Sequence, residues 1–478
     1  MMQDVIIIGC GVTGAACAYA LSRYDLRVTV LEAANDVAAG TTKANSAILH
    51  AGYDPEPGTL MARLNVEGVR MAEEICEKLD VPYKKTGSMV LAFSAEDRAC
   101  LETLLERGRK NGVPGLRLLT GDEAREMEPE LSQEVIAALL APSAAIVNPW
   151  EYALAMAETA VKNGATLHRL CRVTGISKEE DGFTVTTTGG VFRGRYIINA
   201  AGVHAEEIHD MIAPPSFTIR PAKGEYYLLD KSEGTRVSRV IFQCPSHLGK
   251  GVLVSPTVHG NLIVGPTAEP SGAEDVSVTA KGLETVRRLA ARSVPGVKFR
   301  ENIRNFAGVR ANSDRGDFIV GESAVPGFFD AAGICSPGLS AAPAIAGYLV
   351  ELMADRGLEL REKPAYDDTR RRVCFQELDG EARNALLAQD PHYGRVVCRC
   401  ETVTEGEVVA CLHTPIPPAS INGVKRRVGA GMGRCPGGVC GPRVQEIMAR
   451  ELGVGPREIP LEGPGSYILT GETKEAWT

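Results

Sequence analysis

The chain has 478 residues, of which 44% are hydrophobic and 23% are charged; this is an ordinary globular composition, and the length predicts two to four domains. A net charge of −8 argues against a nucleic-acid binder that works by phosphate neutralisation and against a polybasic membrane anchor. Thirteen cysteines, an odd number, favour a reducing compartment, where close cysteine pairs more often bind metal than form disulfides.

The apolar N-terminus carries Asp4 in place of a basic leader, so we do not expect a signal peptide. Asp4–Ile8 is a β-branched run of the kind found in buried parallel strands. An alanine-rich helix is predicted over Ala15–Ser22 and a second strand over Arg27–Leu31. The segment between the first strand and the helix reads G-x-G-x-x-G, which in this context predicts a dinucleotide-binding turn.

Each residue of this turn has a physical task. Gly9 permits the tight turn, Gly11 lets a pyrophosphate approach the backbone, and Gly14 lets the helix pack closely on the strand. The helix N-terminus stabilises the phosphate charge. Glu32, eighteen residues beyond Gly14, is placed to accept hydrogen bonds from the adenosine ribose. The motif does not distinguish NAD from FAD, because both carry the same ADP half.

The next segments are more specific. Residues 40–53 read GTTKANSAILHAGY, and residues 57–64 read PGTLMARL. They resemble the FAD-dependent oxidases and dehydrogenases of the D-amino-acid-oxidase superfamily, most closely its glycerol-3-phosphate dehydrogenase/oxidase and L-2-hydroxyglutarate dehydrogenase branches. The resemblance covers about the first 355 residues. It implies an α/β plus α+β architecture, in which an antiparallel-sheet substrate domain is inserted into a Rossmann-type FAD-binding domain.

The resemblance also assigns the loop that precedes His50. In the family this loop runs over the flavin ring, and the histidine sits beside flavin N5. His50 is therefore expected to remove the hydroxyl proton of the substrate, since a base titrating near neutral pH suits that task; the alternative is a histidine that only hydrogen-bonds the flavin or the loop. The loop residues expected to contact the cofactor are Thr41, Thr42, Lys43, Asn45 and Ser46.

Three later segments complete the expected FAD site. Leu170–Val173 resembles the strand that contacts adenine, residues 196–202 resemble the second FAD motif, and residues 328–340 lead into a helix expected over Ala341–Met353. A helix N-terminus aimed at the flavin would favour the negative charge that develops on reduction. The cofactor contacts expected here are Val173, Ala201, Gly202, Gly333, Ile334, Gly338, Leu339 and Ser340.

The substrate half contains alternating apolar segments at 220–228 and 249–257, the latter paired with 261–265 across a turn. In the glycerol-phosphate branch, a lysine and an arginine from such segments hold the anionic end of the substrate. Lys250 and Arg310 fit those places, and an arginine can bind a phosphate or a carboxylate with two parallel hydrogen bonds. Ala311 stands where many of these enzymes have proline.

The C-terminal region has the pattern C-x-C-x34-C-x4-C. In an extended strand, Cys398 and Cys400 would point the same way and could hold one metal centre with Cys435 and Cys440. Four thiolates suit a [2Fe–2S] cluster or tetrahedral zinc. The pattern resembles the bacterioferritin-associated-ferredoxin type of [2Fe–2S] domain, which also ends the A subunit of anaerobic glycerol-3-phosphate dehydrogenases. The basic residues of 423–434 either offset the cluster charge or form a solvated face.

These observations predict four regions: an FAD-dependent oxidoreductase domain over 1–355, a helical connector over 356–395, a [2Fe–2S] domain over 396–455 and a tail over 456–478. In the first region the FAD-binding part is expected at about 1–80, 143–215 and 300–355, and the substrate part at about 81–142 and 216–299. The longest apolar run, 341–354, is too short to cross a bilayer. We therefore expect a cytoplasmic protein that reaches a membrane only through a partner.

The expected function is oxidation of a small anionic secondary alcohol, with sn-glycerol 3-phosphate as the first choice and dihydroxyacetone phosphate as its product. Electrons would pass from FAD through the [2Fe–2S] cluster to an accepting partner subunit. Three alternatives stay open: a dehydrogenase of L-2-hydroxyglutarate or another 2-hydroxy acid, an amine or imino-acid dehydrogenase, and a non-catalytic electron-transfer subunit. The sequence does not identify the electron acceptor or the oligomeric state.

Overall fold

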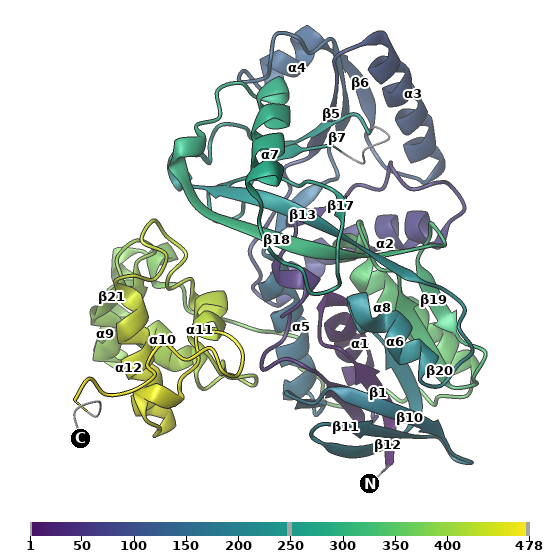
Figure 1. Ribbon diagram of the computed structural model, residues 1–478, viewed down its shortest axis with the longest axis vertical. Helices are drawn as coiled ribbons and strands as arrows, with labels where there is room; N and C mark the ends of the chain where they lie inside the picture. Colours follow the sequence, from purple (N-terminus) through teal and green to yellow (C-terminus); the bar gives the residue numbers. More distant parts are fainter. Residues whose placement is uncertain (1, 246–250, 475–478) are drawn as a thin grey trace. The chain divides into compact units, whose positions relative to one another are not determined.

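The computed structural model describes residues 2–245 and 251–474 (Figure 1). The chain forms two compact units. The first comprises Met1–Glu32 and Val37–Thr369, and the second comprises Ala33–Asp36 and Arg370–Thr478. The second unit thus includes four residues that lie early in the sequence. In the described ranges, no helix is both long and apolar enough to cross a membrane.

The first unit contains an eight-stranded sheet in the order β10-β11-β12-β1-β2-β9, with β20 beside β12 and β19 beside β20. The strands β9, β2, β1, β12 and β20 pair in parallel. Val5–Ile8 of β1 are buried, as expected for a strand covered on both faces. The strands are β1 (Met2–Ile8), β2 (Val28–Leu31), β9 (Thr166–His168), β10 (Val173–Lys178), β11 (Phe183–Thr187), β12 (Gly190–Asn199), β19 (Ile319–Glu322) and β20 (Phe328–Ala332).

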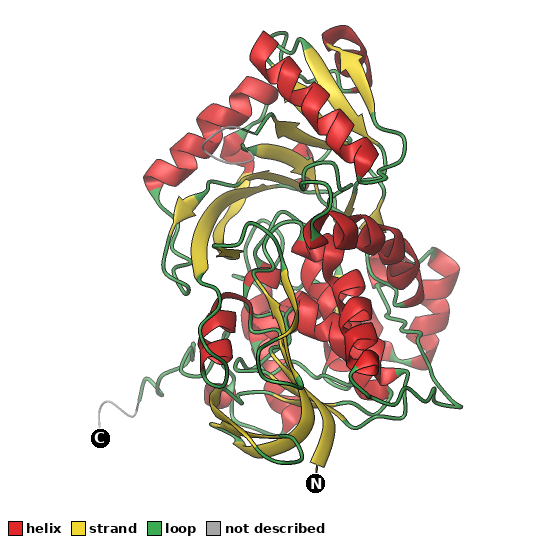
Figure 2. Ribbon diagram, turned by 90° about the vertical axis from the view of Figure 1, so that its right-hand side faces the viewer, coloured by secondary structure: helices red, strands yellow, loops and turns green. Residues whose placement is uncertain are grey.

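A group of mutually packed helices accompanies this sheet, and Figure 2 shows them beside its strands. Helix α1 contacts both α5 and α8, and α2 also contacts α8. The close fit needs small residues, because a Cβ at Gly68 of α2 would lie 2.1 Å from the carbonyl oxygen of Ser340 in α8. The helices of this group are α1 (Val12–Ser22), α2 (Leu60–Lys78), α5 (Pro149–Lys162) and α8 (Gly338–Asp355); α6 (Ala205–Asp210) contacts β12 and β20 of the sheet.

The second sheet of this unit has nine strands in the order β17-β13-β16-β15-β14-β5-β7-β6, with β18 also paired to β13 (Figure 1). All its pairs are antiparallel except β14 with β5. The strands are β5 (Ser88–Ala92), β6 (Arg117–Thr120), β7 (Ala137–Ala141), β13 (Ile219–Leu229), β14 (Val240–Gln243), β15 (Leu253–Pro256), β16 (Leu262–Gly265), β17 (Glu269–Pro270) and β18 (Asn302–Ser313).

Helices α3 (Ala95–Lys110), α4 (Gly121–Met127) and α7 (Ala280–Ser293) pack on the second sheet. A small third sheet, β3-β8-β4, is made of β3 (Ile48–Leu49), β8 (Ala145–Val147) and β4 (Tyr83–Lys84). The expected hairpin in the substrate half is confirmed by the pairing of β15 with β16. A parallel nucleotide-binding sheet combined with a largely antiparallel second sheet confirms the predicted α/β plus α+β class.

The second unit is a small helical unit around one short hairpin. Its core includes Val408, Val424, Val444 and Ile447, all nearly inaccessible to solvent. Its elements are α9 (Gly380–Gln389), β21 (Val396–Cys398), β22 (Val403–Thr404), α10 (Glu405–Cys411), α11 (Ile421–Val428) and α12 (Cys440–Leu452).

Two local expectations were wrong. The connector is helical over α9 but mostly irregular before it, because its polar, arginine-rich start offers no apolar face for a helix to bury. The strand expected from Leu170 starts only at Val173, and Leu170 has a φ of +55°, which is incompatible with extended strand geometry.

Candidate active site

The glycine turn after β1 has the geometry that a nucleotide site requires. Gly9 has a φ of +97°, and a Cβ there would lie 2.5 Å from the carbonyl oxygen of Ala200. A Cβ at Gly14 would lie 1.9 Å from the carbonyl oxygen of Gly9. Helix α1 starts at this turn, and Gly11, its N-cap, supplies no side-chain hydrogen bond. The turn therefore leaves N–H groups at a helix N-terminus for an anion.

The acid at the end of β2 is held against this turn. The Cys10 N–H donates to Glu32 Oε2 over 2.7 Å. One carboxylate oxygen thus fixes Glu32 beside the helix N-terminus, where the sequence placed a ribose contact. Thr42 also reaches this helix, because the Val12 N–H donates to Thr42 Oγ1 over 3.0 Å. Lys43 is half-buried in the same short 3₁₀ turn, Thr41–Lys43.

The two other predicted cofactor turns follow β12 and β20. Ala201 and Gly202 lie directly after β12, and Gly333 directly after β20; both glycines have positive φ values, +61° and +64°. Gly333 is also sterically required, since a Cβ there would lie 2.9 Å from Ser313 Cβ. Val173, the expected adenine contact, is buried at the start of β10.

A buried polar network that the sequence analysis did not single out joins these two turns. Asn199, the last residue of β12, donates from Nδ2 to Asp330 Oδ1 of β20 over 2.8 Å. His209 Nδ1 lies 2.7 Å from Asp330 Oδ2. All three side chains are buried. Burial raises the pKa of Asp330, while the neighbouring His209 and Asn199 oppose that rise. The network fixes the ends of two strands from which the cofactor-facing turns begin.

The loop that the family places over the flavin is anchored by its own polar side chains. Asn45 Nδ2 donates to the carbonyl oxygens of Thr41 and Thr42 over 3.1 and 2.8 Å. Thr41 Oγ1 donates to the Val309 carbonyl over 2.6 Å. Ser46 Oγ lies 3.1 Å from the Tyr226 hydroxyl. The loop is thereby tied to β18 and β13 of the substrate sheet.

His50 lies directly after β3 and is held from two sides by the start of α8. Its backbone N–H donates to Ser340 Oγ over 2.7 Å, and its Nε2 lies 3.2 Å from Ser336 Oγ. Its ring stacks on Phe242 of β14 with a centroid separation of 5.6 Å. Together with Gly52, Tyr53 and neighbouring residues, His50 lines a small hollow. The imidazole thus has a fixed position at an accessible site.

The segment before α8 is shaped by close packing. Pro337, the N-cap of α8, makes no side-chain hydrogen bond to the first turn, and the Gly338 N–H donates to the Cys335 carbonyl over 2.5 Å. A Cβ at Gly338 would lie 2.5 Å from Ile334 Cγ2. An N-terminus of α8 without a capping side chain is the feature expected where a helix is to face developing negative charge.

Arg310 lies in β18, directly opposite Ala222 of β13. Because side chains alternate along strands, Arg310 shares its sheet face with Gly224 and Tyr226 of β13. Gly224 makes room for the guanidinium, since a Cβ there would lie 2.7 Å from Arg310 Nη2. Within residues 2–245 and 251–474, this guanidinium donates hydrogen bonds only to the Thr267 carbonyl, both over 3.4 Å. These bonds are long, so the group can still bind an anion.

The same sheet face contacts the loop of residues 41–46, which the family places over the flavin. A Cβ at Gly308 of β18 would lie 1.8 Å from the carbonyl oxygen of Ala44, and Tyr226 reaches Ser46. Tyr226 is a site residue that the sequence analysis missed; its alternation within the strand was the available signal. Lys250, the second predicted anion-binding cation, lies outside the described residues and stays a prediction.

The four predicted metal-ligand cysteines form two neighbouring pairs. Cys400 Sγ lies 4.0 Å from Cys435 Sγ, and Cys440 lies close enough to Cys398 for that thiol to add to the rise that burial causes in the pKa of Cys440. Among the residues that the structure describes, no group of three or more His, Cys, Asp or Glu side chains is placed to hold a single metal ion. Two pairs suit a two-iron cluster, because four thiolates are then shared between two irons.

The environments of the pairs differ. Backbone N–H groups, first that of Val439, lower the pKa of Cys435, whereas burial raises the pKa of Cys440 to about 12. The close approach requires a glycine at 433, where a Cβ would lie 2.3 Å from Cys400 Cβ. Bound iron would replace the protons of all four thiols.

Two expectations for this region were wrong. Strand β21 ends at Cys398, and Cys400 lies in the following turn, so the two sulfurs do not share a strand face and have different neighbours. Of the basic residues in 423–434, Arg426 and Arg427 do not form a solvated face. They are buried and form ion pairs with Asp36 and Glu462, whose carboxylates come from other segments of the chain.

Comparison with known proteins identifies the first unit. A family model described as FAD dependent oxidoreductase matches residues 4–352. The chain belongs to this family of FAD-dependent oxidoreductases. A second model, described as a BFD-like [2Fe-2S] binding domain, matches residues 396–450. These matches confirm the predicted resemblance and decide for FAD over NAD and for the iron–sulfur cluster over zinc.

Individual relatives of this oxidoreductase agree. It is 46% identical over 476 residues to a glycerol 3-phosphate dehydrogenase of Caloramator mitchellensis, with 99% of both chains covered. It is similar to the FAD-bound structure of L-alpha-glycerophosphate oxidase from Mycoplasma pneumoniae, with a TM-score of 0.74, 31% identity, and coverage of 77% of this chain and 98% of that one. Human mitochondrial L-2-hydroxyglutarate dehydrogenase is 30% identical, with coverage of 55% of this chain and 60% of that protein.

Proposed function

We propose that this oxidoreductase converts sn-glycerol 3-phosphate to dihydroxyacetone phosphate. The observation that carries the proposal is the 46% identity to a glycerol 3-phosphate dehydrogenase over 476 residues, which include the iron–sulfur domain. When bound, FAD supplies the acceptor for the hydride that leaves carbon 2 of the substrate. The chain must then bind the phosphate, orient the hydroxyl group and remove its proton.

His50 is the proposed base. As hydride leaves the carbon, the hydroxyl must lose its proton, and an imidazole exchanges protons near neutral pH. The Ser340 hydroxyl fixes the His50 backbone, and Ser336 and Phe242 limit how the ring can turn. This restraint supports a positioned base, since proton transfer depends on a reproducible distance to the hydroxyl.

Arg310 is the proposed phosphate ligand. Arg310 is half-buried and lies on the sheet face that meets the loop of residues 41–46. Its guanidinium donates two long hydrogen bonds, over 3.4 Å, to the Thr267 carbonyl. A guanidinium in this state can offer two parallel N–H groups to a phosphate. Lys250 is proposed as a second cation. Tyr226, on the same face, is proposed to help orient the glycerol end.

The [2Fe–2S] cluster, with Cys398, Cys400, Cys435 and Cys440 as proposed ligands, gives the electrons an exit. A cluster accepts one electron at a time, so it can pass the two electrons of each turnover to a partner in separate steps. We propose an accepting partner protein in the cytoplasm, through which the enzyme can reach a membrane.

Anaerobic stopped-flow absorbance tests the substrate assignment. The flavin is mixed with glycerol 3-phosphate and, in parallel, with L-2-hydroxyglutarate. Fast bleaching by glycerol 3-phosphate alone is the expected result. Faster bleaching by L-2-hydroxyglutarate would instead identify a hydroxy acid as the substrate. Amines and an external reductant are tested in the same way: bleaching by amines alone would indicate an amine dehydrogenase, and bleaching by the reductant alone would indicate a non-catalytic electron-transfer subunit.

A further inference from the structure

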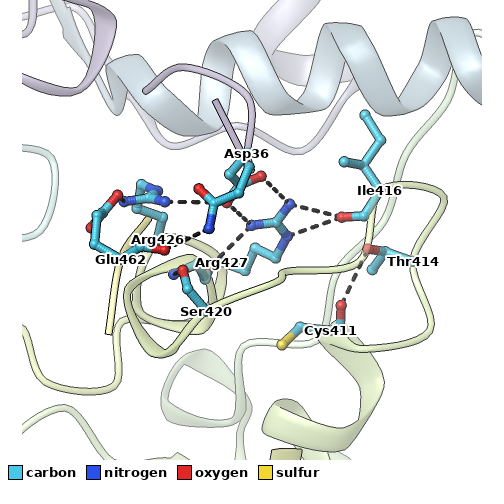
Figure 3. A network of polar contacts seen from close by, with 10 residues as sticks. Asp36, Cys411, Thr414, Ile416, Ser420, Arg426, Arg427 and Glu462 are labelled. Atoms are coloured by element: carbon cyan, nitrogen blue, oxygen red, sulfur yellow. Dashed lines mark hydrogen bonds and ion pairs between the residues drawn. The ribbon is translucent and has the colours of Figure 1, made fainter. Parts of the chain in front are cut away.

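Asp36 is the centre of a buried ion-pair network in the second unit (Figure 3). Arg427 binds its carboxylate with two parallel hydrogen bonds, from Nη1 to Oδ2 over 2.8 Å and from Nη2 to Oδ1 over 2.9 Å. Arg426 Nη2 donates to the same Oδ2 over 3.2 Å. The Asp36 and Arg427 side chains are 1% and 3% exposed. These are charge-assisted bonds removed from water, the strongest class of hydrogen bond in a protein.

Asp36 supplies the carboxylate that both guanidiniums of this network share. Arg426 also pairs with Glu462 over 2.8 Å, so two guanidiniums meet two carboxylates. Arg427 additionally donates to the Ile416 carbonyl over 2.7 Å. Loss of Asp36 would remove the carboxylate that pairs with both buried guanidiniums. Loss of one partner from a buried pair is far more costly than loss of an exposed pair.

The segment that brings Asp36 to this network is short and starts at the nucleotide site. Asp36 follows Glu32 by four residues, and Glu32 accepts the Cys10 N–H. The segment returns to the same residue, since the Ala38 N–H donates to the Cys10 carbonyl over 2.9 Å. Cys10 thus anchors both ends of the segment, and Cys10 lies inside the glycine turn that receives the FAD pyrophosphate.

We propose that Asp36 is a positioning residue that couples the retention of FAD to the folding of the iron–sulfur unit. FAD orders the glycine turn, and with it the segment that presents the Asp36 carboxylate to Arg426 and Arg427. The folded iron–sulfur unit in turn orders that segment and favours FAD binding. The coupling must be reciprocal, because each event changes the affinity of the other by the same factor. The inference rests on the cofactors and is independent of the proposed substrate.

The test is a thermodynamic cycle on the full-length protein. FAD dissociation constants are measured by flavin fluorescence for the cluster-loaded protein and for protein from which iron has been removed. We expect FAD to bind at least about fivefold more tightly to the loaded wild type, the low end of typical allosteric coupling. In Asp36→Asn, which keeps the size but loses the charge, the ratio should fall to about one. The reciprocal readout is the cluster content, followed by absorbance, at equilibrium with a competing iron chelator, measured with and without FAD.

Matched controls separate coupling from general instability. Glu73→Gln breaks an exposed ion pair of the first unit, and Glu446→Gln breaks one of the second; both should keep the wild-type ratio. Arg427→Lys keeps the charge but loses the parallel hydrogen bonds, and the ratio of its FAD dissociation constants should be intermediate. This variant carries the test if Asp36→Asn does not fold. A wild-type ratio of one, or a wild-type ratio retained in Asp36→Asn, would overturn the proposal.

Discussion

Replacing Gly224 with alanine should weaken substrate binding although the new methyl group touches no proposed substrate contact. The added Cβ would lie 2.7 Å from Arg310 Nη2, 2.7 Å from Pro266 Cβ and 3.0 Å from the Thr267 carbonyl oxygen. The backbone on the Thr267 side yields little, whereas the guanidinium is the far end of a flexible chain. We therefore expect Arg310 to swing out of its place over Gly224.

The size of the effect follows from what Arg310 is proposed to do. A hydrogen bond to a charged group contributes about 1.5–3 kcal/mol, and about 1.4 kcal/mol corresponds to a factor of ten. Losing the guanidinium from the phosphate should raise KM for glycerol 3-phosphate about 10- to 150-fold. The change in kcat should be smaller, because the phosphate is bound equally in the ground and transition states.

Steady-state kinetics with a dye acceptor would measure the changes in KM and kcat separately. Thermal unfolding would measure the loss of stability caused by the added methyl group, about 1–3 kcal/mol. Gly175→Ala is the matched control, because a Cβ at this strand glycine meets nothing within 4 Å. Arg310→Gln should reproduce the rise in KM. A folded, FAD-replete Gly224→Ala enzyme with KM within twofold of wild type would refute the placement of Arg310 at the phosphate.

Three further outcomes are expected. His50→Gln should slow anaerobic flavin reduction about 100-fold or more while FAD stays bound; an unchanged rate would remove His50 as the base. Gly433→Ala should lower iron and sulfide content, since its Cβ would lie 2.3 Å from Cys400 Cβ, whereas Gly441→Ala, whose Cβ meets nothing within 4 Å, should not; equal iron contents would contradict this geometry. Burial opposes but does not cancel the effect of three neighbouring arginines, which lower the pKa of Glu405, so the stability that this ionised carboxylate contributes is present above its ordinary pKa of about 4.5 and is lost as pH falls through the lowered pKa. Glu405→Gln should therefore lower the free energy of unfolding by about 1–2 kcal/mol at pH 7 and make it depend less on pH below about pH 4.5. A variant whose acid-unfolding curve runs parallel to that of the wild type would argue against the ionised pair.

The sequence by itself determined the features that local chemistry dictates. A β-branched run, three glycines and an alanine-rich helix specify a strand, a turn and a close-packed helix within some twenty residues, and Gly9 has the positive φ that such a turn requires. The same holds for the cysteine pattern, whose spacing and residue type indicated a metal centre and whose resemblance to a known [2Fe–2S] domain favoured the cluster over zinc. In both cases the interacting residues are neighbours in the chain, or share a chemistry that few other residues have.

Tertiary structure decided what depends on register and on contacts between distant segments. Tyr226 joined Arg310 on one sheet face only because β13 pairs with β18 in a particular register, and a shift by one residue would have turned it away. Cys398 and Cys400 separated because the strand ends between them. Asp36 looked like an ordinary loop acid, and its partners lie about 390 residues further along the chain. A local pattern carries no information about such a partner, because the burial that makes the ion pair strong is created by the fold as a whole.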